Sequence, residues 1–171
     1  MSFRNREDAG RALATELRER VRGEDVVVLG LARGGVAVAA EVARQLDAPL
    51  DAVVVEKLGA PRQPELAMGA IAPGGVRVMN DDVVRAMNIS EEEIGQIEAN
   101  ERRELRSKEE MYRAERPPSP ITGRTALLVD DGLATGASMR AAIAFARSED
   151  AGRVVVAVPV GASATCRDIE R

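Results

Sequence analysis

The fold is decided by one stretch of the chain, Leu127-Leu128-Val129-Asp130-Asp131-Gly132-Leu133-Ala134-Thr135-Gly136-Ala137-Ser138. The apolar run from Ala126 to Val129 predicts a buried parallel strand, and a helical pattern begins at Met139 after the loop. Ligands of open α/β sheets bind where such strands end. The stretch therefore predicts an α/β fold and places a binding site at the end of this strand.

The loop that follows the strand has the composition of a phosphate site. Its small side chains let backbone N–H groups approach an anion, and the next helix directs the positive end of its dipole at the same point. Two hydroxyl side chains add further donors. The residues expected to bind the phosphate are Ala134, Thr135, Gly136, Ala137 and Ser138.

Two adjacent carboxylates, Asp130 and Asp131, precede this loop. Carboxylates do not suit direct contact with phosphate, but they accept hydrogen bonds from the two neighbouring hydroxyls of a ribose, or bind a phosphate-bound Mg²⁺ through water. One loop can therefore bind both ends of a ribose 5-phosphate.

These twelve residues resemble the phosphoribosyl-diphosphate-binding motif of the type I phosphoribosyltransferases. The shared pattern is a hydrophobic run, two acids, small residues, Thr-Gly, then a small residue and Ser or Thr. The resemblance implies Mg²⁺-dependent transfer of a phosphoribosyl group from phosphoribosyl diphosphate to a nitrogenous base, with release of pyrophosphate. It gives Asp130 and Asp131 catalytic roles. The alternative is an ordinary strand–turn–helix in which Asp and Gly only form the turn.

A second glycine-containing turn, Gly30-Leu31-Ala32-Arg33-Gly34-Gly35, joins an apolar strand to a helix. Glycines allow the backbone to approach anionic oxygens, and Arg33 offers a fork of donors. In the resembled family this position holds the pyrophosphate loop. The resemblance therefore implies a catalytic role for Arg33 and ligand binding by Gly34 and Gly35. Taken alone, the segment could equally be a strand-to-helix turn.

The segment 56–65 resembles, in its Lys-x-Gly-x-Pro pattern, the start of the flexible loop that closes over the reactants in adenine- and xanthine-type members. Lys57 is expected to neutralise the leaving pyrophosphate, and Arg62 to add charge when the loop closes. We expect this loop to be mobile without ligand, because it offers few apolar anchors. The alternative is a solvated surface loop with routine prolines.

The rest of the chain alternates predicted strands and helices. Strands are expected at 26–30, 50–55, 125–130 and 154–160, with a hairpin of 66–71 and 76–79 around Pro73-Gly74-Gly75. Helices are expected at about 7–22, 34–46, 90–113, 136–149 and 162–171, the third starting at a Ser90–Glu93 capping box. This order predicts one phosphoribosyltransferase-like α/β domain over 1–171, a parallel sheet with helices on both faces. The charged helix is expected to pack on the surface through Ile94, Ile97, Leu105 and Met111.

Composition narrows the possible functions. The 171 residues are 45% apolar and 30% charged, with a net charge of −4, which is typical of a globular protein and does not favour nucleic acid. The absence of histidine excludes Ser-His-Asp and Cys-His catalysis and His-based metal sites. With no apolar run of membrane-spanning length, no signal segment and Cys166 as its single cysteine, we expect a cytoplasmic protein that does not bind membranes.

Two departures from the family pattern keep the substrate and the activity open. Members that act on 6-oxopurines commonly have Asp immediately before the Thr-Gly, whereas this chain has Ala134, as in the adenine, uracil or orotate pattern. The hood that covers the base is expected to be short or missing at the C-terminal end. A regulatory module that binds phosphoribosyl diphosphate without transferring it is therefore the alternative to the enzyme, and a generic nucleotide-binding domain is a weaker one. The expected partners are phosphoribosyl diphosphate, a small nitrogenous base and a second copy of the chain in a homodimer.

Overall fold

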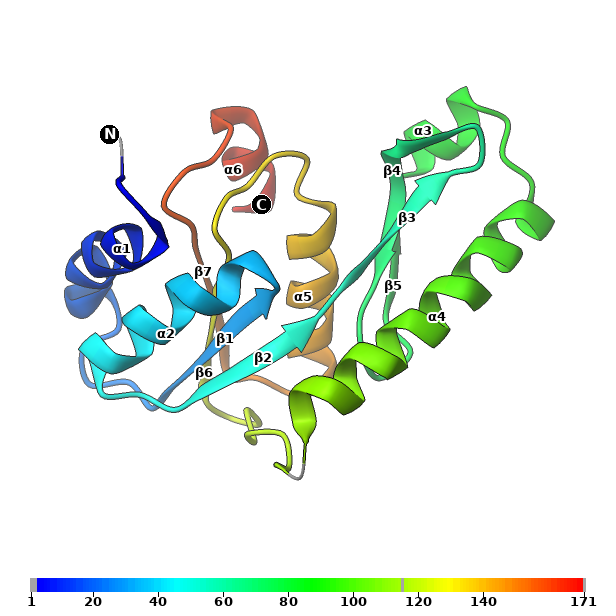
Figure 1. The fold of residues 1–171 in the computed structure, drawn as a ribbon. Helices are drawn as coiled ribbons and strands as arrows, with labels where there is room; N and C mark the ends of the chain where they lie inside the picture. The colour runs from blue at the N-terminus through cyan, green and yellow to red at the C-terminus, as the bar shows by residue number, and fades with distance from the viewer. Residues whose placement is uncertain (1–2, 115, 171) are drawn as a thin grey trace.

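The computed structural model describes residues 3–114 and 116–170, arranged as Figure 1 shows. The helices in these residues are α1 (Arg6–Arg20), α2 (Gly34–Leu46), α3 (Asp81–Ala86), α4 (Glu91–Arg113), α5 (Ala137–Ser148) and α6 (Ser163–Ile169). The strands are β1 (Val26–Ala32), β2 (Leu50–Val54), β3 (Glu56–Ala60), β4 (Gln63–Ile71), β5 (Arg77–Met79), β6 (Thr125–Val129) and β7 (Arg153–Ala157). They form a parallel main sheet in the order β2-β1-β6-β7 and an antiparallel second sheet in the order β3-β4-β5.

The central strands β1 and β6 of the main sheet are buried on both faces, which explains why they are almost entirely apolar in the sequence, whereas the edge strands β2 and β7 include Asp51 and Arg153. Along β1, Val27 and Leu29 belong to the core on the α5 side, whereas Val26 and Val28 belong to the core under α1 and α2. Figure 1 shows α1 and α2 on one side of the sheet and α5 on the other. The predicted fold class, a parallel sheet with helices on both faces, is confirmed.

The pairing of β1 with β6 brings the two predicted ligand loops together. These strands are parallel neighbours, with Gly30 opposite Val129. Because both strands run in the same direction, the loops that begin at Arg33 and Asp130 leave the same edge of the sheet. The expectation that both loops lie at one edge is therefore confirmed.

The second sheet and α4 enclose a separate core. Ile94 and Leu105 of α4 are buried against Leu58, Met68 and Ile71. The capping box is formed as predicted, with Ser90 and Glu93 each accepting from the other's backbone N–H. The predicted apolar stripe is correct over most of the helix but not at Met111, which is 71% exposed.

The interpretation of residues 57–65 as a loop with few apolar anchors is wrong, whereas its mobility without ligand stays a prediction. Residues of this segment form β3 and β4, which pair as a hairpin around Pro61 and Arg62. The side chains of Leu58 and Ala60 are fully buried in the core beneath α4, and they provide the apolar anchors that the sequence pattern does not reveal. The hairpin is irregular, with register shifts on both sides of Gly59.

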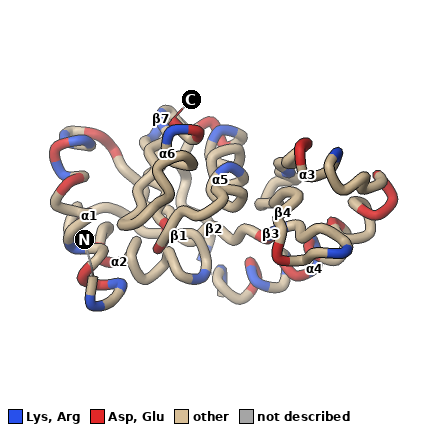
Figure 2. Tube along the Cα trace, turned by 90° about the horizontal axis from the view of Figure 1, so that it is seen from above, with Lys and Arg blue, Asp and Glu red and all other residues tan. Residues whose placement is uncertain are grey.

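The surface carries charges of both signs. Figure 2 shows acidic and basic positions interspersed along the outer segments of the molecule, α4 included. Within residues 3–114 and 116–170, no helix combines the length and the apolar character that a membrane crossing requires.

Candidate active site

A cavity of about 600 Å³ lies at the edge of the main sheet, where β6 ends. Its floor is the whole loop from Asp130 to Met139. Lys57 of β3 lines it from the second sheet, and Val160, Gly161 and Ala162 line it after β7. The structure thus gathers both acids, the phosphate-loop residues and Lys57 around one cavity, as the sequence predicts.

The phosphate loop presents an uncapped helix N-terminus to this cavity. Gly136 precedes α5 in a left-handed conformation, with φ of +80°, and among the described residues no side chain caps the helix. The first N–H groups of an α-helix have no partner within the helix. Those of α5 lie at the cavity with Thr135 and Ser138, an arrangement that suits an anion.

The last helix stabilises the conformation of this loop. The Thr165 hydroxyl of α6 donates to the carbonyl oxygen of Ala134 at 2.7 Å. Backbone N–H groups of Leu133 and Ala162 donate to the carbonyls of Val160 and Leu133, each at 3.0 Å. The loop is therefore tied at Leu133 to the segment after β7 and at Ala134 to α6.

The glycines of the second loop pack directly against the acid pair. A Cβ atom on Gly35 would lie 2.5 Å from the Val129 carbonyl oxygen and 2.8 Å from Cα of Asp130, and one on Gly34 would lie 2.6 Å from Cγ of Asp131. Only glycine permits this approach. Gly34 and Gly35 therefore position the acid pair, and they are not among the residues that line the cavity.

Asp130 is partly buried at the end of β6. Burial raises the pKa of its carboxyl to about 6, and the charge of Asp131 favours the same direction. The backbone N–H of Asp131, which donates to Oδ1 of Asp130 at 2.8 Å, and the positive charge of Lys57 both oppose the rise. A carboxyl with a pKa near 6 is ionised at neutral pH, so Asp130 can accept a hydroxyl hydrogen there.

Asp131 forms an ion pair with a residue that the sequence did not predict as part of the site. Arg6, the first residue of α1, donates through Nε and Nη2 to Oδ2 of Asp131 at 3.0 and 2.8 Å. The pair is partly exposed. The two residues are 125 positions apart, and no local pattern marks their contact. The contact of Thr165 with Ala134 was missed for the same reason.

Two sequence-predicted charges lie away from the cavity. Arg33 is exposed beside the cis peptide bond that links it to Ala32, and it is not among the lining residues. The Arg62 guanidinium donates to the Met87 carbonyl at 2.9 Å and pairs with Glu93 at 3.7 Å, so it lies away from the cavity in this structure, and its approach to the pyrophosphate on loop closure stays a prediction. Of the predictions for Arg33, the structure supports only its position at the same sheet edge as Asp130.

The metal chemistry open to this site is limited to the acid pair. Among the described residues, no group of three or more His, Cys, Asp or Glu side chains is arranged to hold an ion. Mg²⁺ that arrives on a phosphorylated substrate needs only one or two protein carboxylates, with water and phosphate as its other ligands. Asp130 and Asp131 fit that mode of binding.

Comparison with known proteins agrees with this geometry. A Mycobacterium tuberculosis protein, Rv0571c in strain H37Rv and MT0597 in strain CDC 1551, is named provisionally as a phosphoribosyl transferase and is 53% identical over 159 residues. That alignment covers 93% of this chain but only 36% of the relative, so the chain spans about a third of the length of these curated relatives.

Solved structures share the fold. TT1426 from Thermus thermophilus superposes with a TM-score of 0.82 at 44% identity, over 99% of this chain and 80% of that one. A purine phosphoribosyltransferase from Pyrococcus horikoshii superposes with a TM-score of 0.53 at 18% identity, over 92% and 74% of the two chains, a likeness of fold alone. Residues 2–170 match the phosphoribosyl transferase domain family. The chain therefore belongs to the phosphoribosyl transferase domain family.

Proposed function

We propose that this chain transfers the phosphoribosyl group of phosphoribosyl diphosphate to a nitrogenous base and releases pyrophosphate. The observation that carries the proposal is the convergence, in one cavity, of the Asp130–Asp131 pair with the uncapped N-terminus of α5. The first suits the two ribose hydroxyls and the second suits the 5-phosphate.

The binding mode follows from where the two groups lie. The 5-phosphate contacts the backbone of residues 134–138 and the hydroxyls of Thr135 and Ser138. The ribose hydroxyls donate to Asp130 and Asp131, and Lys57, which lines the same cavity, faces the pyrophosphate. The family resemblance implies that the pyrophosphate lies beside the 33–35 loop, which leaves the same edge of the sheet without lining the cavity. Asp130 and Asp131 would hold a pyrophosphate-bound Mg²⁺ through water, and the ion would supply positive charge to the leaving group.

Catalysis in this site rests on positioning and charge. Displacement at the anomeric carbon breaks the bond to pyrophosphate, forms a bond to the base nitrogen, and develops negative charge on the leaving group. Lys57 neutralises that charge, and the two carboxylates hold the ribose ring in place. The chain, which has no histidine, needs no covalent nucleophile for this chemistry.

The central test is isothermal titration with phosphoribosyl diphosphate and Mg²⁺, followed by a screen of bases for pyrophosphate release. Saturable binding and release with at least one base are expected. Tight binding without release from any base would favour a regulatory module. Absence of binding would overturn the proposal. A homodimer in the cytoplasm is also part of the proposal, to be tested by the mass in solution and by localisation.

Ser138→Ala is expected to weaken binding of phosphoribosyl diphosphate by about 1.5–3 kcal/mol, because it removes one hydrogen bond to a charged phosphate. Ser148→Ala is the matched control, since Ser148 lies at the other end of α5 and donates to the Phe145 carbonyl. The measurement is the dissociation constant by titration. Equal affinity of the Ser138 variant and the control would show that Ser138 does not contact the phosphate.

Lys57→Ala is expected to lower turnover more than affinity, because its contact strengthens as charge develops on pyrophosphate. A ten- to hundredfold loss of kcat, of about 1.4–2.7 kcal/mol, is the expected scale. Arg62→Ala, in the same hairpin but directed toward Met87, is the control and should leave kcat unchanged. A larger loss from the Arg62 variant than from the Lys57 variant would contradict this assignment.

A further inference from the structure

A second cavity, of about 560 Å³, lies between the start of α1, the first turns of α2 and the segment after β7. Its apolar wall includes the ring of Phe3 and the exposed side chains of Ala37 and Val160. Asp131 and Val160 line both this cavity and the phosphoribosyl cavity. The two cavities are therefore neighbours that meet at one of the proposed ribose-binding carboxylates.

This shared boundary lies where an acceptor has to approach. The reacting carbon of the ribose is bonded to the carbon whose hydroxyl is one of the two that the acid pair accepts. The incoming nitrogen must therefore reach a point beside Asp130 and Asp131. A further cavity, near α3 and α6, shares Thr135 and Ala137 with the phosphoribosyl cavity and so lies at its phosphate end, several bonds from the reacting carbon.

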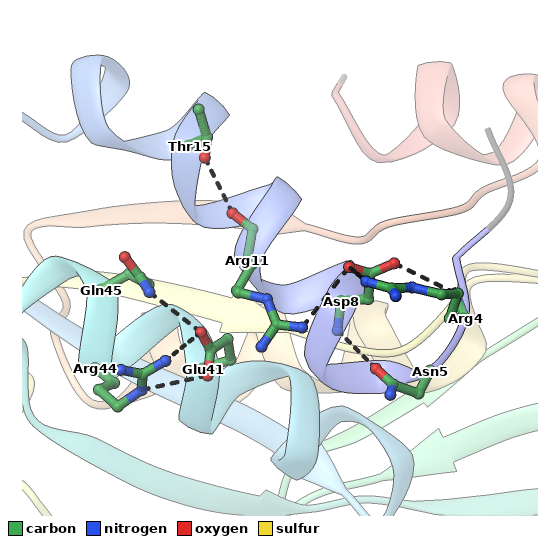
Figure 3. Close-up of polar contacts among 8 residues, drawn as sticks. All are labelled: Arg4, Asn5, Asp8, Arg11, Thr15, Glu41, Arg44 and Gln45. Atoms are coloured by element: carbon green, nitrogen blue, oxygen red, sulfur yellow. Dashed lines mark hydrogen bonds and ion pairs between the residues drawn. The ribbon is translucent and has the colours of Figure 1, made fainter.

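The start of α1 is held firmly enough to form one wall of a binding site. Figure 3 shows the Asn5 side chain accepting from the Asp8 N–H, at 2.8 Å, and Arg4 and Arg11 both pairing with Asp8. Behind this turn α1 contacts α2 closely, because a Cβ on Gly10 would lie 2.9 Å from the Val38 carbonyl oxygen. These contacts keep the first turn of α1 beside α2.

Arg6 supplies the polar group of this second cavity. Its guanidinium directs Nε and one N–H of Nη2 at Asp131. An arginine has five N–H donors and no acceptor, so the remaining donors can bind only an oxygen or nitrogen lone pair. A ligand here would meet apolar surface on its faces and a fixed cationic donor at its edge.

We propose that this second cavity binds the acceptor, a flat nitrogen heterocycle that carries a carbonyl or carboxylate oxygen, with that oxygen on the Arg6 guanidinium. The proposal rests on the function proposed above and names the acceptor's site and chemical class. Phe3, Ala37 and Val160 contact the ring, and Asp131 connects its position to the ribose.

The experiment fills the cavity without disturbing the core. Ala37 is exposed on α2 and lines the cavity, so Ala37→Met occupies it. Ala40 is also exposed on α2 but is not among the lining residues, so Ala40→Met is the matched control. Binding of uracil, orotate, hypoxanthine and adenine is measured by ligand-observed NMR with saturating ribose 5-phosphate, which has no leaving group and cannot turn over.

At least one oxygen-bearing base is expected to bind the wild type and Ala40→Met, and to bind Ala37→Met at least about tenfold more weakly because of the clash. Arg6→Gln should weaken that base by about tenfold through the lost charged hydrogen bond, while any binding of adenine stays unchanged. The proposal is overturned if no oxygen-bearing base binds, if adenine binds best, or if Ala37→Met binds like the wild type.

Titration of each variant with phosphoribosyl diphosphate and Mg²⁺ separates this proposal from the one on which it rests. Ala37→Met and Ala40→Met should bind phosphoribosyl diphosphate within about twofold of the wild type, because neither residue lines its cavity. If the wild type and both variants bind phosphoribosyl diphosphate normally but Ala37→Met does not weaken binding of the base, only the proposed acceptor site is overturned. Failure of the wild type to bind phosphoribosyl diphosphate overturns both proposals.

Discussion

Gly35→Ala is expected to damage both the stability and the ligand site of this protein. The new Cβ would lie 2.5 Å from the Val129 carbonyl oxygen and 2.8 Å from Cα of Asp130. Both are backbone atoms at the end of β6, a strand paired on both sides, so they cannot move aside without disturbing the sheet. Overpacking of this kind costs about 1–3 kcal/mol, and the same shift displaces Asp130.

Urea unfolding and titration with phosphoribosyl diphosphate measure the two effects. Affinity should fall at least about tenfold, as expected when a charged hydrogen bond is lost. Gly95→Ala is the control, because, apart from the adjacent backbone of α4 itself, no atom of the described residues lies within 4 Å of the Cβ position at this glycine. It should stabilise the protein by about 0.5–1 kcal/mol. Wild-type stability and affinity in Gly35→Ala would show that the two loops do not need their close contact.

Asp130→Asn is expected to stabilise the protein at pH 8 while impairing its function. Burial raises the pKa of Asp130 from 3.8 to about 6, so its ionised form is disfavoured in the folded state. The amide removes that charge and keeps an oxygen that can accept from the Asp131 N–H. The expected gain is about 1–3 kcal/mol, allowing for the partial exposure of the side chain.

The contribution of Asp130 to the free energy of unfolding changes with pH in a definite direction. Between pH of about 4 and 6 the folded wild type keeps a proton on Asp130 that the unfolded chain has lost, so this group's contribution to stability falls as the pH rises. Above a pH of about 6 Asp130 is ionised in both states, and the full free-energy cost of burying its charge is present. Urea unfolding without Mg²⁺ should therefore show the variant more stable than the wild type at pH 8, with little difference at pH 4. The reverse order would mean that burial does not disfavour the charge.

The functional cost of Asp130→Asn is measured by the same titration. Affinity for phosphoribosyl diphosphate should fall by about 1.5–3 kcal/mol, because a neutral amide replaces a charged acceptor of a ribose hydroxyl. Asp131→Asn is the comparison: it should also weaken binding, but without the gain in stability, because it removes an ion pair with Arg6. Unchanged affinity in both variants would contradict the assignment of the acid pair to the ribose.

Local sequence determined the parts of this protein whose signals lie within a few residues. The strand–loop–helix units of residues 26–46 and 125–148 follow from apolar runs, small loop residues and helical periodicity, and the structure contains them within a few residues of the predicted bounds. The start of α4 follows from the capping box of Ser90 and Glu93. Because the carboxyl ends of neighbouring parallel strands share one edge, the meeting of the two ligand loops could also be predicted.

Only the tertiary structure decided the contacts between distant segments. Residues 57–65 read as a loop because of their glycine and prolines, but burial of Leu58 and Ala60 beneath α4 outweighs that local preference and makes them a hairpin. The same packing directs Arg62 away from the cavity. Arg6 reaches Asp131 only because α1 packs on α2 beside the end of β6, and across 125 positions no pattern in the sequence carries that information.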